Sequence, residues 1–185
     1  MFVRICLLSV LFMGALAAPA ASEDRETTKW SQVGGWHIRV DLAKDSCYAQ
    51  QGYEDGTWLR IGFNMKNRAV YFALGNDNWR SLEAGKVYPA KFVFDDQKIY
   101  DSQLAAFAWG DRVVLGHTNV GAEFVGDFME KAGLRIYYRG PQMVHLSLRD
   151  SHDALHQLID CQKAMMEAGG SSKPGVRPAG DPFAQ

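Results

Sequence analysis

Hydrophobic and polar residues alternate over several stretches of the chain, which is typical of strands with one buried face. Trp36, Ile38, Val40 and Leu42 occupy every second position of one such stretch. Segments 46–53 and 57–64 flank an Asp-Gly pair at 55–56, a combination that predicts a β-hairpin. The same alternation predicts further strands over 68–74, 86–94, 112–115, 134–139 and 143–148.

Two segments follow the periodicity of a helix instead. Near the C-terminus Leu155, Leu158, Ile159, Gln162, Met165 and Met166 fall on one arc of a helical wheel. Asp150 or Ser151 supplies the N-terminal cap of this helix, and Gly169-Gly170 ends it. A shorter helix is predicted within 119–132, and the Ala-rich run 104–108 is interpreted as a single helical turn.

Consecutive strands joined by hairpin turns favour a mainly β (α+β) fold. We expect an antiparallel β-sandwich or barrel-like domain with a C-terminal amphipathic helix and one shorter helix. The expected organisation is a signal peptide over 1–20, a flexible lead-in over 21–29, a single β-rich domain over 30–168 and a disordered tail over 169–185.

The N-terminal segment has the three parts of a secretory signal. Arg4 provides the positive charge, the apolar run 5–16 follows it, and small residues at 15–20 supply the cleavage site. The apolar run is short for a membrane span, so we expect cleavage, with no span afterwards. The predicted location is the periplasm.

Two cysteines remain after removal of Cys6 with the signal. In an oxidising compartment Cys47 and Cys161 are expected to form a disulfide between an early strand and the last helix. Two buried free thiols, or an intermolecular bond, are the alternatives.

Charge and motifs narrow the possible functions. The formal net charge of -1 argues against nucleic-acid binding, and no nucleotide or cofactor motif occurs. His152 and His156 resemble the zinc pattern H-E-x-x-H, but Asp153 replaces the general-base glutamate, so we expect a solvated helix face without metal. His37, His117 and His145 are left as the candidates for an enzyme.

Aromatic residues provide the candidate binding patch. Trp58 and Arg60 lie on the face of their strand opposite Leu59 and Ile61. Together with Trp79 they form a recognition patch if that face is solvated, because Trp and Arg dominate protein-binding hot spots. If the sheet is covered on both faces, the same residues belong to the core.

The end of the domain resembles small exported bacterial proteins of the invasion-associated locus B type. Residues 146–155, L-S-L-R-D-S-H-D-A-L, are similar to the S-L-x-G-x-x-x-A-L segment of that family. Arg149-Asp150 replaces the usual lysine and glycine, and the cysteine spacing differs. The resemblance implies a periplasmic, non-enzymatic β-domain with envelope or host-interaction roles.

We therefore expect a periplasmic, non-enzymatic binding protein without cofactor that acts on a protein or cell-envelope partner. Two alternatives remain open: an inhibitor of a cell-wall hydrolase of the lysozyme type, and an uncharacterised hydrolase.

Overall fold

The computed structural model describes residues 27–95 and 97–171. The predicted signal peptide, residues 21–26 of the lead-in and residues 172–185 of the tail lie outside the described residues. No helix in the described part of the chain is long and apolar enough to cross a membrane.

Ten strands form one antiparallel sheet in the order β1-β2-β3-β4-β5-β8-β7-β6-β9-β10. The strands are β1 (Thr27–Val33), β2 (Trp36–Asp41), β3 (Ser46–Gly52), β4 (Thr57–Asn64), β5 (Ala69–Asn76), β6 (Val87–Phe94), β7 (Ile99–Trp109), β8 (Arg112–His117), β9 (Gly133–Tyr137) and β10 (Gln142–Ser147). Two helices complete the fold, α1 (Ala122–Glu130) and α2 (Ser151–Ser171). The mainly β, α+β class is confirmed.

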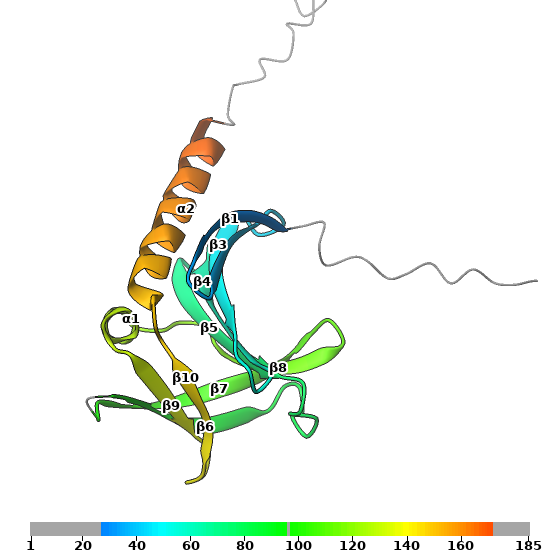
Figure 1. The fold of residues 1–185 in the computed structure, drawn as a ribbon. Coiled ribbons are helices and arrows are strands. Elements are labelled where there is room, and N and C mark those ends of the chain that lie inside the picture. Colours follow the sequence, from blue (N-terminus) through cyan, green and yellow to red (C-terminus); the bar gives the residue numbers. More distant parts are fainter. Residues whose placement is uncertain (1–26, 96, 172–185) are drawn as a thin grey trace, which may run out of the picture.

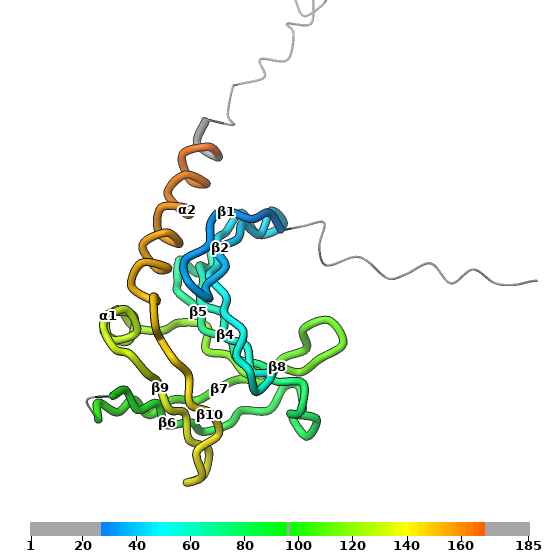
Figure 2. The backbone as a smooth tube through the Cα atoms, viewed as in Figure 1, coloured from blue at the N-terminus to red at the C-terminus, as the bar shows by residue number. Residues whose placement is uncertain are grey.

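The sheet is sharply bent, so that β1–β5 form one half and β8, β7, β6, β9 and β10 the other (Figure 1). β1 and β10 end the sheet without pairing to each other, so the barrel is not closed. Helix α2 packs on β1, β2 and β3, and α1 packs on α2 (Figure 2). Besides the pairing of β5 with β8, side-chain hydrogen bonds join the halves, among them one from Tyr53 Oη to the Ser147 carbonyl at 3.0 Å and one from Trp36 Nε1 to the Arg149 carbonyl at 3.0 Å.

A single hydrophobic core fills the inside of the bend. Alternate residues of β2 to β10 point into it, and both helices add their apolar faces. Phe124 of α1 lies at its centre and makes edge-on contacts with Phe72, Phe92, Phe94 and Tyr100. The alternation read from the sequence is therefore the inward–outward alternation of the sheet.

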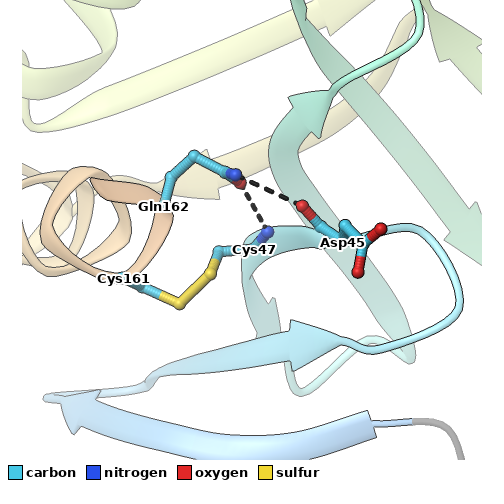
Figure 3. Close-up of a disulfide and its surroundings, with 4 residues drawn as sticks. All are labelled: Asp45, Cys47, Cys161 and Gln162. Carbon is cyan, nitrogen blue, oxygen red and sulfur yellow. Dashed lines mark hydrogen bonds between the residues drawn. A yellow bond between two sulfur atoms is a disulfide. The ribbon is translucent and has the colours of Figure 1, made fainter. Parts of the chain in front are cut away.

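The predicted disulfide between Cys47 and Cys161 is present and ties α2 to the start of β3 (Figure 3). Both cysteines are fully buried. Beside them the buried Gln162 side chain accepts a hydrogen bond from the Cys47 N–H at 2.9 Å and donates one to the Asp45 carbonyl at 3.3 Å. A helix side chain thus satisfies backbone groups at the start of β3 and in the turn before it.

Three predictions need correction. The run 104–108 is not a helical turn but part of β7, because Leu104 and Ala106 point inward while the strand pairs with both β6 and β8. Residues 27–29, expected in the flexible lead-in, belong to β1 and pair with β2. Met166, expected on the buried arc of α2, is 53% exposed.

An ionic cluster fixes α1 to the sheet. The Asp127 carboxylate accepts hydrogen bonds from the Tyr100 hydroxyl and, at 2.8 Å, from the Lys98 ammonium, which also meets Glu123 at 2.8 Å. Burial alone would raise the pKa of Asp127, but the hydrogen bonds from Lys98 and Tyr100 outweigh it and lower this pKa below its usual value.

Replacing Asp127 by Asn should therefore destabilise the protein in a pH-dependent way. Because the folded-state pKa is the lower one, the stabilisation is present above the unfolded pKa of about 4 and is lost as pH falls below it. Urea unfolding should show a deficit of about 1 kcal/mol at pH 6, since Lys98 is partly exposed and the pair is screened. This deficit should shrink toward pH 3; a deficit that is equal at both values would contradict the role of the ionised carboxylate.

Candidate functional site

The outward face of β4 carries the first side chains of the candidate site. Leu59 and Ile61 are fully buried in the core, whereas Trp58 and Arg60 alternate with them and are partly exposed on the opposite face. Because α2 packs on the side of the sheet that carries the core, the face of Trp58 and Arg60 is the one opposite α2. The strand pattern thus presents an aromatic ring and a cation together on the outside of the sheet.

Arg60 lies between two aromatic rings. Its guanidinium carbon is 3.9 Å from the centroid of the Tyr48 ring and 4.4 Å from that of the Trp109 ring. The Arg60 Nε–H donates to Gln50 Oε1 at 2.8 Å. No carboxylate among the described residues pairs with Arg60. A half-buried cation is thus stabilised by ring faces and by one amide.

Trp109 reaches Arg60 from the end of β7. The β7–β8 hairpin turns at Gly110, whose φ of 60° suits glycine, and Arg112 opposite Trp109 forms an ion pair with Asp77 at 2.6 Å. The Trp109 ring contacts Trp58 edge-on, with centroids 5.8 Å apart, and meets the neighbouring Phe107 at the same separation. Trp109 is the central ring of the cluster.

Glycines in neighbouring strands make room for these rings. A Cβ at Gly75, the cross-strand partner of Trp58, would lie 2.5 Å from the indole, and one at Gly116 would lie 2.6 Å from the Phe107 ring. Gly62, opposite Tyr48, is equally crowded by Tyr48 and Tyr71. Aromatic rings laid over glycines stabilise the pairing of such strands.

Tyr71 lies beside this cluster on β5. Burial raises the pKa of its hydroxyl to about 12, although the charge of Arg60 and a hydrogen bond from it act in the opposite direction. The Tyr71 hydroxyl is therefore neutral at physiological pH.

A groove of about 670 Å³ opens beside Trp109, between the β2–β3 turn, the β4–β5 turn and the β7–β8 strands. We call it the outer groove. Its apolar lining comes mainly from Phe63, Met65, Phe107 and Trp109, and Lys44 and Lys66 lie at its rim. Its size is within the usual range of ligand pockets.

The three predicted patch residues are not all together. Trp58 and Arg60 share the cluster, but Trp79 lies in the loop after β5, where it packs against the core. Trp79 and Trp58 both line a separate hollow of about 400 Å³. Sequence reasoning missed Trp109, since β7 was interpreted as partly helical and its faces could not be assigned.

Of the candidate histidines His117 lines the outer groove, whereas His37, His145, His152 and His156 are not part of its lining. His152 and His156 are exposed on α2 with ring centroids 4.6 Å apart, and His152 Nδ1 lies 3.0 Å from Asp153. In the described part of the chain no group of His, Cys, Asp and Glu could hold a metal ion. His37, His117 and His145 form no hydrogen bond or ion pair with a carboxylate of the described residues.

Comparison with known proteins shows a likeness of the fold and no likeness of the sequence to a family model or curated protein. No protein-family model and no curated protein sequence matches the chain. The structure is similar to the crystal structure of invasion associated protein B from Bartonella henselae, with a TM-score of 0.54 and 14% sequence identity. The match covers 72% of this chain and 97% of that one. The predicted resemblance is confirmed at the level of the fold.

Proposed function

We propose that the protein is an exported, non-enzymatic binding protein of the periplasm that holds a protein partner against the outward face around Trp58, Arg60 and Trp109. The single observation that carries this proposal is Arg60, which lies between the Tyr48 and Trp109 rings without a carboxylate partner among the described residues. Residues of this type supply most of the binding energy in protein interfaces.

Two further features support it. The disulfide fits an oxidising compartment, and the fold is shared with an invasion-associated bacterial protein. The face also has the shape expected of a recognition surface, because half-buried rings lie beside a groove and pack closely over glycines of the neighbouring strands. Rings fixed in this way lose little conformational entropy on binding.

Capture of a partner from an envelope extract tests the proposal. The oxidised full-length protein should retain a defined protein that a Trp109→Ala variant and a Trp58→Ala/Arg60→Ala variant lose at least tenfold. Trp30→Ala is the matched control, because Trp30 is 42% exposed on β1, outside the cluster. Equal capture by all the variants would contradict this face as the binding site.

A further inference from the structure

The charges around the outer groove are unevenly distributed. Arg60, Lys66 and Arg68 have no ion pair with any described residue, and Lys66 and Arg68 are both exposed in the β4–β5 turn. Lys44, at the opposite rim, is held by Asp41 at 2.6 Å. Among the lining residues Asp45 is the one carboxylate. The surroundings therefore have an excess of positive charge.

The lining of the groove combines apolar and polar groups. Phe63, Met65 and Phe107 offer an apolar seat, and methionine adapts its shape to different side chains. Ser46 and Thr118 interrupt that seat with hydroxyl groups, and Asn64 adds an amide whose oxygen already accepts from the Lys66 and Asn67 N–H groups. A peptide backbone can use these polar groups, whereas an acyl chain would leave them unpaired.

Arg60 has donors left for an anion. A guanidinium carries five N–H donors in its plane, of which Gln50 engages one. Its N–H donors point outward in the plane of the group, beside the Tyr48 and Trp109 rings, so an anion binds them in that plane. In-plane approach is the geometry of carboxylate recognition by arginine.

We propose that the outer groove binds an acidic-apolar peptide segment of the partner, with an apolar side chain seated between Phe63, Phe107 and Trp109 and flanking carboxylates on Arg60 and the β4–β5 turn. This inference rests on the proposed function. It follows from the apolar lining, from Lys66 within that lining, and from Arg60 beside the Trp109 ring.

A synthetic peptide panel tests the chemistry directly. The first probe is a capped hexapeptide with a Phe-Leu pair flanked by two glutamates on each side; the second replaces every glutamate by lysine; the third keeps the glutamates and replaces Phe-Leu by Gly-Ser. The first probe should shift the Trp109 indole resonance of the oxidised full-length protein at submillimolar concentration. The other two should bind at least tenfold more weakly.

Exposed charge variants keep the test independent of folding. Lys66→Gln/Arg68→Gln should weaken the first probe at least fivefold, and so should an increase in salt from 50 to 300 mM. Lys29→Gln/Lys163→Gln, which removes exposed cations from β1 and α2, should leave its affinity unchanged. Equal binding of the glutamate and lysine probes, or an unshifted Trp109 resonance at millimolar probe, would overturn the inference.

The same variants separate this inference from the proposed function. If Trp109→Ala loses the captured envelope partner while Lys66→Gln/Arg68→Gln retains it and no acidic probe binds, the binding face stands and the acidic ligand is wrong. If Trp109→Ala retains the partner, the proposed site itself fails.

Discussion

Removing the Cys47–Cys161 disulfide should lower the free energy of unfolding by about 4 kcal/mol. The bridge joins residues 114 positions apart, so in its absence the unfolded chain gains the entropy of a very long open loop. The double variant Cys47→Ala/Cys161→Ala should accordingly unfold at a melting temperature roughly 10–15 °C lower than the oxidised protein. Urea unfolding followed by tryptophan fluorescence measures the loss.

The reduced wild-type protein is the matched control, because it has both sulfur atoms but no covalent link. Its free energy of unfolding should match that of the double variant, apart from the packing energy of the two sulfur atoms that the variant lacks. The buried position of both cysteines adds a kinetic expectation: a reductant should cleave the bond only when α2 separates from β3. A double variant within about 1 kcal/mol of the oxidised protein would contradict the entropic account.

The alternation of side chains predicted the face on which Trp58 and Arg60 stand, since one strand places every second residue on the same side. Their contact with Trp109 depends on the bend of the whole sheet, which brings the β7–β8 hairpin over β4. Spacing along the chain contains no information on that bend. The position of Trp58 and Arg60 on the outward face was therefore predictable, whereas their contact with Trp109 depends on long-range geometry.

The structural errors have related physical causes. β1 is an edge strand whose side chains are mostly exposed, so burial imposes no alternation on it; it gains its order from pairing with β2. In the Ala-rich part of β7 the two bulky residues, Leu104 and Phe107, are three positions apart, a spacing that suits a helix as well as a strand; the strand is defined by its pairing with β6 and β8. In both segments tertiary pairing overrides a weak local signal.

Replacing Trp36 by Ala should cost about 3–5 kcal/mol, as expected for a large aromatic residue in a packed core. Trp36 is fully buried, and its ring meets Phe128 of α1 edge-on with centroids 5.8 Å apart. Its indole N–H also donates to the Arg149 carbonyl, just before α2 begins. One side chain on β2 therefore holds the ends of both helices.

Trp36→Phe separates packing from hydrogen bonding, because it keeps a ring while leaving the Arg149 carbonyl without its donor. It should cost about 1–3 kcal/mol, less than Trp36→Ala. The exposed Trp30 again serves as control: Trp30→Ala should change stability by no more than about 0.5 kcal/mol. Hydrogen exchange of backbone amides measures the local effect of Trp36→Ala. The exchange rate should increase most in α1, because Phe128 loses its neighbour there. If α1 keeps wild-type protection in Trp36→Ala, the helix is held chiefly by the contacts of Phe124 and Asp127, and the role given to Trp36 is wrong.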